Sequence, residues 1–493
     1  MSLLLSDSVS DYSAYIVFVI IFLTLYLRQR SINSLPPGPT PLPIVGNVLS
    51  YGKTPYKRIC EWAEKFGDII TLYQGPFRVV LWVNDGQLAI DMFQKQPDLF
   101  SQRNPVPFMT YNMAAEGSVV WENGPAWKAR RRWMITALRH FGMGKRSLEV
   151  KIKTETDIFC QEAANYHSNP FNPQHIVNCA VANIICNIAF GDRYEYSDPE
   201  FQELLQNLLK FFKQCSLKNI EMHIPSIMSL PMFKHKALPA IYLTEFVRNQ
   251  VKKHKETFDP ENIRDITDRL LAEGEMCDKE EKKFFNPDVM WTSLLTIFVA
   301  GAETTSSTLM WFFIYMATYQ EVQDKVRKEI DDVLDGRKPT MADQSSLPYF
   351  EATTYEVQRL GNIAGATLPH GNAQECVVKG YKIPKGTIIN LNLYRIHTDP
   401  KYWDDPMTFD PSRFLIDDGK KVSKPKMFMP FGIGRRACLG ESMAKMEIFL
   451  VMTNFFQRFK LIIPEGETLP DLDPLVGLTM SPKPFKVCAI PRE

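Results

Sequence analysis

The residue best placed for chemistry is Cys438, which lies in the glycine-rich run Phe431–Gly440 (FGIGRRACLG), directly before a helix predicted from Glu441. Glycines at 432, 434 and 440 allow positive φ and a close approach of the backbone to a flat partner. The positive end of the helix and the arginines at 435 and 436 favour an anion. Together these features predict a lowered thiol pKa and a thiolate that can act as a ligand.

Several kinds of cysteine chemistry can be compared for this run. A nucleophilic cysteine needs a base close by, and no histidine lies in the run. Zinc and iron–sulfur sites need clustered cysteines, whereas the others are scattered, at positions 60, 160, 179, 186, 215, 277, 376 and 488. A single thiolate on a glycine loop fits one axial ligand of a haem iron. The plain structural alternative is a buried free cysteine in a turn.

A second unusual stretch is Asn286–Tyr319, which the sequence predicts to be one long helix with Asn286 as its N-cap and Pro287 in its first turn. Apolar residues on all its sides predict burial at the centre of the protein. The run Ala300–Thr305 (AGAETT) places a glycine, an acid and two threonines at mid-helix, which argues against a membrane span. Such local breaks in a helix tend to mark functional sites.

Composition and length indicate one large globular body behind a short N-terminal segment. The chain has 493 residues, 45% apolar and 23% charged, and a net charge of +1. This balance argues against nucleic acid as the main partner. No Gly/Ser-rich linker, low-complexity tract or repeat divides the chain. We expect a membrane anchor at residues 1–30, a proline-rich hinge at 31–50 and a single domain at 51–493.

The anchor prediction depends on Tyr12–Leu27, an uncharged apolar run that is short for a bilayer but sufficient if its flanks contribute. Asp7 and Asp11 precede it and Arg28 and Arg30 follow it, so the positive-inside rule places the bulk of the protein in the cytosol. A cleaved signal peptide would carry its positive charge first and end in a small-residue cleavage site, and neither is present. Nine cysteines without framework spacing fit a reducing cytosol.

FGIGRRACLG resembles the haem-binding signature of the cytochrome P-450 family, and AGAETT is similar to that family's oxygen-binding groove. The resemblance covers essentially the whole chain, in the family's order and spacing, and looks most like the animal microsomal enzymes of the second family. It implies a mainly α fold with a small β region (α+β), the cytochrome P-450 fold, preceded by a single N-terminal transmembrane helix. The implied cofactor is haem b, with Cys438 as the axial ligand of its iron.

The resemblance also implies roles for residues around the haem. In WENGPAWKARRRWMITALRHF, Trp127 and Arg131 match residues that hold a propionate, and His370 in TLPHG matches a further propionate donor of a related microsomal branch. Glu303 would feed protons, and Thr304 would hydrogen-bond dioxygen. The implied cofactor-binding residues are Trp127, Arg131, Ala300, Gly301, His370, Phe431, Arg436, Cys438 and Gly440.

A buried charge network is implied as well. EVQR contains Glu356 and Arg359, three residues apart on one helical face, and FDPSRF adds Arg413 as a third member. Ser412 departs from the glutamate that the family often has there, and it leaves Arg413 intact. By resemblance, the candidate substrate-pocket residues are Phe108, Met109, Phe298, Ala302, Ile363, Leu368 and Met480.

The function implied is that of an oxidoreductase, a monooxygenase that inserts one oxygen atom into a lipophilic substrate such as a steroid, fatty acid or xenobiotic. Electrons would come from NADPH–cytochrome P-450 reductase, with cytochrome b5 as a further candidate, and this chain would not bind NADPH itself. Cations between Lys128 and His140, with Arg435 and Lys420–Lys426, would form the docking surface for that partner.

The expected location is the endoplasmic reticulum (microsomal) membrane, with one membrane pass and the catalytic domain facing the cytosol. The apolar segment Ile224–Phe233 (IPSIMSLPMF) resembles the loop that dips into the bilayer at the substrate entrance, although packing in the core explains it as well.

Two other functions fit a haem-thiolate protein. An isomerase or dehydratase that rearranges a peroxide needs neither dioxygen nor an acid–threonine pair. A non-enzymic haem-binding sensor needs neither a proton relay nor a surface for an electron donor. Glu303, Thr304 and the basic surface favour the monooxygenase.

Overall fold

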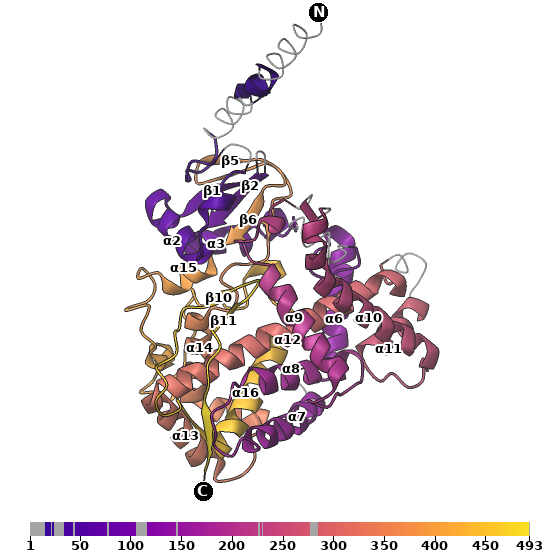
Figure 1. Cartoon of the computed structure of the whole chain (residues 1–493), viewed down its shortest axis with the longest axis vertical. Coiled ribbons are helices and arrows are strands. Elements are labelled where there is room, and N and C mark those ends of the chain that lie inside the picture. The colour runs from indigo at the N-terminus through magenta and orange to yellow at the C-terminus, as the bar shows by residue number, and fades with distance from the viewer. Residues whose placement is uncertain are drawn as a thin grey trace, which may run out of the picture. The chain divides into compact units, whose positions relative to one another are not determined.

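The structure of the chain, shown in Figure 1, is a computed structural model. It contains two compact units. The smaller unit comprises Met1–Phe108, Leu217–Pro225 and Ala366–Asn392, and the larger comprises Met109–Ser216, Ser226–Gly365 and Leu393–Glu493. The residues that the structure describes are 15–20, 22–23, 34–42, 45–75, 78–104, 116–143, 146–224, 227–228, 230–276 and 284–492. The expectation of a single catalytic domain from residue 51 stays a prediction.

A four-stranded sheet of order β1-β2-β6-β3 forms the centre of the smaller unit. β1 and β2 pair antiparallel, with Ile69 opposite Val83, and β2 runs parallel to β6. Apolar side chains of α2 and of both strands form one buried cluster that includes Ile59, Leu72 and Trp82. The elements of this unit are η1 (Val48–Ser50), α2 (Pro55–Phe66), β1 (Ile69–Gln74), β2 (Arg78–Val83), α3 (Gly86–Phe93), α4 (Pro97–Phe100), η2 (Ile220–Met222), β3 (His370–Gly371), β4 (Cys376–Val378), β5 (Tyr381–Ile383) and β6 (Ile388–Leu391).

The larger unit is built around one long helix, α12, against which α8, α10, α14 and α16 pack. Its helices are α6 (Gly124–His140), α7 (Arg146–Ala164), α8 (Gln174–Ala189), α9 (Pro199–Gln214), η4 (Pro231–Ala237), α10 (Leu238–Thr257), α11 (Ile266–Met276), α12 (Pro287–Thr318), α13 (Gln320–Leu334), η5 (Met341–Ser346), α14 (Pro348–Gly361), α15 (Leu393–Thr398), η6 (Pro411–Phe414), η7 (Gly434–Arg436) and α16 (Glu441–Arg458). Its strands are β7 (Leu415–Ile416), β8 (Lys421–Val422), β9 (Phe459–Ile462), β10 (Leu475–Val476), β11 (Met480–Ser481) and β12 (Cys488–Pro491). The predicted mainly helical fold with small sheets is confirmed.

Local sequence explains why α12 begins where it does and why it is buried. The Asn286 side chain accepts a hydrogen bond from the N–H of Asp288, as an N-cap does, and Pro287 occupies the first turn. Within the described part of the chain, one segment, Asp288–Thr318, is long and apolar enough to cross a membrane. Because 78% of its most apolar stretch is buried inside the protein, it is a core helix.

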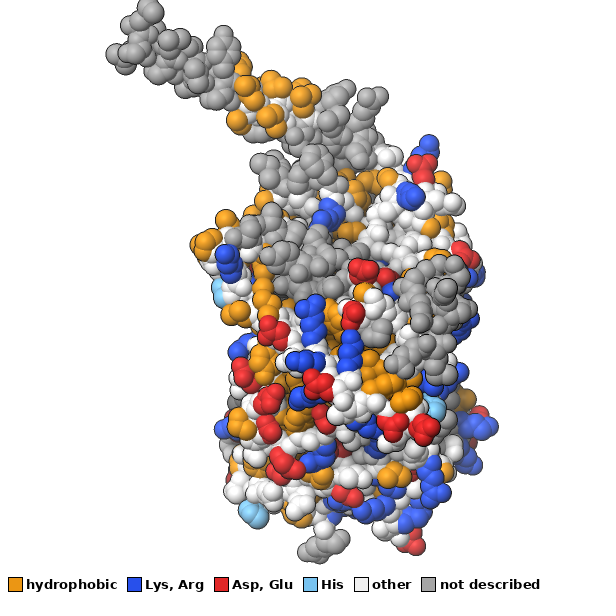
Figure 2. All heavy atoms as spheres, turned by 90° about the vertical axis from the view of Figure 1, so that its right-hand side faces the viewer, with side chains coloured by type: hydrophobic (Ala, Val, Ile, Leu, Met, Phe, Trp, Pro, Cys, Tyr) orange, Lys and Arg blue, Asp and Glu red, His pale blue; other side chains and the backbone are white. Residues whose placement is uncertain are grey.

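The predicted anchor lies mostly outside the described residues. Of it, the structure describes residues 15–20 and 22–23, which are helical, and their apolar side chains are exposed (Figure 2). The transmembrane helix therefore stays a prediction.

Candidate active site

The loop before α16 presents Cys438. The backbone N–H of Cys438 donates to the carbonyl oxygen of Phe431 at 2.8 Å, which closes the loop. Gly432 and Gly434 adopt φ values of 72° and 73°, where glycine is strongly favoured. Gly440 instead has a φ of −93° and is the N-cap of α16, so the prediction of positive φ was wrong for this glycine.

The sulfur of Cys438 lies at the N-terminus of α16. Backbone N–H groups of Gly440 and Glu441 donate to it, because the first turn of a helix has N–H groups without helical partners. The side chain is exposed on one side. Even so, the protein around it raises the pKa of the Cys438 thiol by burial, and the two N–H groups and the charge of Arg131 only reduce that rise. The predicted lowering of the pKa was therefore wrong for the free thiol, and a stable thiolate here needs a bound cation such as a metal ion.

Trp127 and Arg131 lie one helical turn apart on α6, beside the Cys438 loop. Arg131 Nη2 donates to the carbonyl oxygen of Ala437 at 2.7 Å. The Arg436 guanidinium stacks over the Trp127 ring at 3.7 Å and donates to the carbonyl oxygens of residues 120 and 122. Trp127 is 5% exposed, and its Nε1 has no hydrogen-bond partner among the described residues. A buried N–H group is unfavourable without an acceptor, so Trp127 and the neighbouring Arg131 fit a carboxylate of a haem.

The middle of α12 has one accessible face. Ile297, Ala300, Gly301 and Thr304 are partly or fully exposed, whereas most of their neighbours on the helix are buried. Their spacing of three, four and seven residues places them on one side of the helix. Ala300, Gly301 and Thr304 were predicted from the sequence to be site residues, whereas Ile297 was not, although its position one turn before Ala300 was the available signal.

α12 is unbroken along this face, whereas the sequence suggested a local break in the helix. α12 is continuous from Pro287 to Thr318, and the Thr304 hydroxyl donates to the Ala300 carbonyl at 2.8 Å. A Cβ at Gly301 would lie 2.6 Å from Cδ1 of Ile185, so the glycine allows α8 to pack closely against α12.

Glu303 lies next to Thr304 in the chain but about 100° further around the helix. Its side chain is 5% exposed, and its Oε1 accepts hydrogen bonds from Ser307 Oγ at 3.0 Å and Thr479 Oγ1 at 3.1 Å. Burial raises the pKa of Glu303 to about 7, and the two hydroxyl groups reduce that rise. A carboxyl group with this pKa can both take up and release a proton near neutral pH.

A second buried acid, Glu447 on α16, was not predicted from the sequence. The residue is completely buried, and neither carboxyl oxygen has a well-formed hydrogen bond among the described residues. Burial raises its pKa to about 8, and the nearby Thr305 side chain of α12 reduces that rise. Nothing in the sequence around residue 447 indicated that its side chain is buried, because a glutamate in an amphipathic helix normally faces solvent.

We expect Glu447 to make the protein less stable as pH rises from about 5 to 8. The native state keeps the Glu447 proton until its pKa of about 8, whereas an unfolded chain releases it near the ordinary glutamate pKa of about 4.5. The unfolded state then binds fewer protons over this interval, and the free energy of unfolding falls. Glu447→Gln should remove this loss, which is at most about 5 kcal/mol.

Urea unfolding at pH 5.5 and 8.5 measures the effect, with the exposed Glu465→Gln as matched control. Parallel pH dependences in wild type and Glu447→Gln would show that Glu447 ionises normally.

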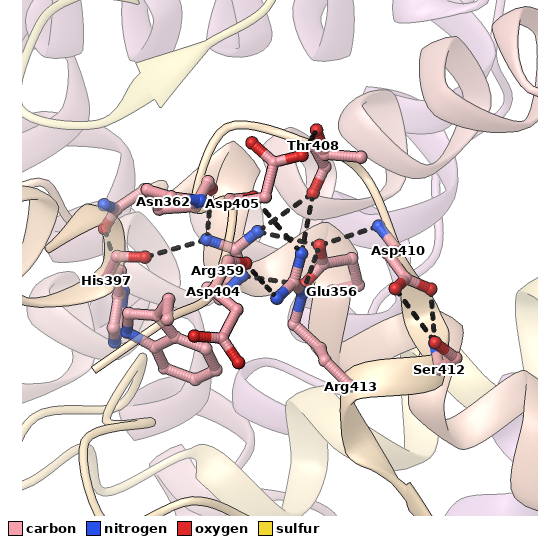
Figure 3. A network of polar contacts seen from close by, with 12 residues as sticks. Glu356, Arg359, Asn362, His397, Asp404, Asp405, Thr408, Asp410, Ser412 and Arg413 are labelled. Carbon is pink, nitrogen blue, oxygen red and sulfur yellow. Dashed lines mark hydrogen bonds and ion pairs between the residues drawn. The ribbon is translucent and has the colours of Figure 1, made fainter. Parts of the chain in front are cut away.

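A buried ion network surrounds Glu356 on α14 (Figure 3). Glu356 and Arg359 are both 0% exposed and make two hydrogen bonds of 2.7 Å, while Arg413 Nε reaches Glu356 Oε1 at 3.0 Å. Arg359 Nη1 also donates to the carbonyl oxygens of His397 and Pro406, at 2.8 and 2.6 Å. The structure thus brings together the three residues expected to form the network, and backbone carbonyl groups satisfy the remaining donors.

Glu356→Gln should destabilise the protein by about 3–5 kcal/mol, because it leaves the buried Arg359 without its counter-charge. Denaturant unfolding measures the loss, and failure to accumulate folded protein is the extreme form of the same result. The exposed Glu321→Gln on α13 is the control and should cost under about 1 kcal/mol. Equal midpoints for wild type and Glu356→Gln would show that the pair does not stabilise the fold.

The candidate substrate-pocket residues do not all reach the accessible face of α12. Phe298 is 0% exposed and packs against Phe190 and Phe246, and Ala302 is 2% exposed. Both lie outside that face, since each residue turns the helix by about 100°, and their place in a substrate pocket stays a prediction.

The other pocket candidates lie elsewhere. Within the larger unit, the N–H of Met480 donates to the carbonyl oxygen of Ile363 at 2.8 Å. Leu368 and His370 belong to the smaller unit, where His370 Nδ1 lies 3.0 Å from the Phe100 carbonyl oxygen. Their roles at the site stay predictions. Phe108 and Met109 lie outside the described residues.

Comparison with known proteins gives consistent matches along nearly the whole chain. Residues 36–489 match the family model described as Cytochrome P450. Human cytochrome P450 2U1 is 35% identical over 495 residues, covering 94% of this chain and 90% of the relative. Human cytochrome P450 2J2 is 36% identical over 476 residues, covering 95% and 93%, and human cytochrome P450 2D6 is 34% identical over 489 residues, covering 97% of each.

The matched range includes the Cys438 loop, the accessible face of α12 and the Glu356 network, and it confirms the resemblance found in the sequence. The chain therefore belongs to the cytochrome P450 family and is a monooxygenase of that family, whose cofactor is a haem with a thiolate ligand.

Proposed function

We propose that this protein holds haem b through Cys438 and inserts one oxygen atom of dioxygen into a lipophilic substrate, with electrons from an NADPH-dependent reductase. The observation that best supports this proposal is that one compact unit contains both the Cys438 loop and the accessible α12 face around Ala300 and Thr304. In the proposed reaction, two electrons and two protons enter with dioxygen. One oxygen atom goes to the substrate and the other leaves as water.

Each residue has a separate task in this proposal. When bound, a haem with a thiolate ligand supplies dioxygen binding and O–O cleavage. Cys438 would hold the group, and Trp127 Nε1 and Arg131 would donate to its carboxylates. Glu303 would take up and release a proton, which its pKa of about 7 supports. Thr304 would position that proton with its hydroxyl at the accessible face.

The electron donors we propose are NADPH–cytochrome P450 reductase and, as a second donor, cytochrome b5. Exposed cations attract an acidic partner and speed its association at low salt. The exposed basic side chains of α6 and of the Cys438 loop are Lys128, Arg132, Arg139, His140 and Arg435.

We propose a lipophilic substrate, a steroid, a fatty acid or a xenobiotic, because Ile297, Ala300 and Gly301 offer it an uncharged surface. A site lined in this way distinguishes molecules mainly by shape.

We place the protein in the endoplasmic reticulum membrane, with residues 1–30 as a single span and the rest in the cytosol. Large apolar side chains are also exposed near residue 230, with Leu230 at 47%, Met232 at 70% and Leu238 at 59%. Such a patch supports a second contact with the bilayer.

Deletion of residues 1–30 should raise the fraction of protein that high salt extracts from membranes, while haem binding persists. Some attachment through the patch near residue 230 should remain, and Met232→Glu should reduce it further. A truncated protein that cannot bind haem would mean that the N-terminal segment is part of the core.

Reconstitution with the reductase tests the proposed activity. Purified protein, reductase, NADPH and isotopically labelled dioxygen are incubated with lipids and steroids that perturb the haem spectrum. The expected product carries one labelled oxygen atom and forms only with the reductase present. Turnover of a peroxide without the reductase would instead support an isomerase or dehydratase, and binding without product would support a sensor.

A further inference from the structure

The Glu303 carboxyl group is hydrogen-bonded from two separate elements. Ser307 belongs to the same helix one turn later, whereas Thr479 lies in the turn between β10 and β11. Among the described residues, both hydrogen bonds end on Oε1, so the orientation of the carboxyl group depends on where the β10–β11 turn lies.

The β10–β11 turn is itself firmly held within the larger unit. The N–H of Leu478 donates to the carbonyl oxygen of Phe212 at the end of α9, at 2.9 Å. Trp311 Nε1 of α12 donates to the Met480 carbonyl oxygen at 2.9 Å, and the N–H of Met480 donates to the carbonyl oxygen of residue 363 at 2.8 Å. With both flanking residues hydrogen-bonded in this way, the backbone of Thr479 is held in place relative to α12.

Glu303 also lines a narrow crevice that reaches toward the surface. The space open to water centres is about 10 Å³, which is close to the room that one water molecule needs. Glu303 shares the crevice with the polar side chains of Gln174, Asn178, Ser307, Ser481 and Lys483. Lys483 is half-buried and pairs with Asp471.

We infer that Thr479 is a positioning residue, which holds the Glu303 carboxyl group at this crevice and away from the accessible face of α12 before the proton is transferred. The inference deepens the proposed function, since it concerns the acid of the same reaction. In it, a proton from solvent reaches the Glu303 carboxylate through a water in the crevice, and the protonated side chain must leave Thr479 to deliver that proton toward Thr304.

The groups around Glu303 determine in which direction its pKa should change when the Thr479 hydroxyl is lost. Burial raises the pKa of Glu303, while hydrogen bonds from Ser307 and Thr479 and the positive charge of Lys213 lower it. A donated hydrogen bond stabilises the carboxylate, so loss of the Thr479 hydroxyl must raise the pKa further. Lys483, which lines the crevice, pairs with Asp471, and that substitution leaves the pair unchanged.

The test compares Thr479→Val, which keeps the shape and loses the hydroxyl, with Thr479→Ser, which keeps the hydroxyl. The infrared carboxyl band of the haem-loaded protein is titrated from pH 6 to 9, and the Glu303 signal is the band lost in Glu303→Gln. Glu447, whose pKa is about 8, is identified in the same way with Glu447→Gln. Thr318→Val is the matched control, because the Thr318 hydroxyl donates to Ile314 on the same helix, far from Glu303.

We expect the Glu303 midpoint to rise by about one pH unit in Thr479→Val and to stay near the wild-type value in Thr479→Ser and Thr318→Val. The pH profile of product formed per NADPH should shift to higher pH by the same amount. An unchanged midpoint in Thr479→Val overturns the inference. Wild-type product yield in Glu303→Gln overturns the proposed role of the acid instead, so the two failures can be told apart.

Discussion

Cys438→Ser should lose the red-shifted Soret band of the ferrous carbon monoxide complex, or should fail to retain haem at all. A serine hydroxyl is a harder and far less acidic ligand than a thiol, so it does not reproduce the electron donation of a thiolate to iron. The loop itself should survive, because its closing hydrogen bond runs from the backbone N–H of residue 438 to the Phe431 carbonyl oxygen.

Cys376→Ser is the control for this substitution. Cys376 is half-buried in β4 of the smaller unit, and its replacement should leave the spectrum unchanged. If Cys438→Ser kept the wild-type band, another residue would be the ligand and the assignment of the site would be lost.

The features that could be predicted from sequence are those that depend on near neighbours in the chain. The N-cap Asn286 and the long apolar run after it were enough to predict α12, since caps and apolar periodicity act over one or a few turns. The place of Cys438 beside a helix N-terminus followed in the same way. The pair Glu356 and Arg359 followed from a spacing of three residues.

The features that could not be predicted depend on contacts between distant parts of the chain. Burial decides the direction of the pKa shifts of Cys438 and Glu447, and no local pattern reports burial of a polar side chain. Thr479 reaches Glu303 across 176 residues of sequence, and only the folded β10–β11 turn makes that contact. Which side of α12 stays accessible also depends on distant contacts, and Phe298 lies on a covered side, where it packs against Phe190 and Phe246.

Thr304→Ala should bind haem and substrate and draw electrons from the reductase, yet convert less of the NADPH into product. The Thr304 hydroxyl is the polar side-chain group on the accessible face of α12, and at rest it donates to the Ala300 carbonyl oxygen. Loss of one positioned proton donor typically costs about 10²–10⁴ in rate. The electrons that no longer reach product should appear as hydrogen peroxide released into solution.

Two variants separate the hydroxyl group from the helix that carries it. Thr304→Ser keeps a hydroxyl at the same place and should retain most of the product yield. Thr308→Ala removes a buried hydroxyl that donates to the Thr304 carbonyl oxygen, one turn further along α12, and should behave as wild type. Loss of yield in Thr308→Ala as well would point to a general loosening of the helix.

The most direct test of the account is the balance of NADPH consumed, product formed and hydrogen peroxide released by wild type and Thr304→Ala, with the reductase present. We predict that NADPH consumption continues in Thr304→Ala, that product per NADPH falls steeply and that peroxide rises in step. Equal product per NADPH in the two proteins would contradict the proton-positioning role of Thr304 and with it the proposed use of this site.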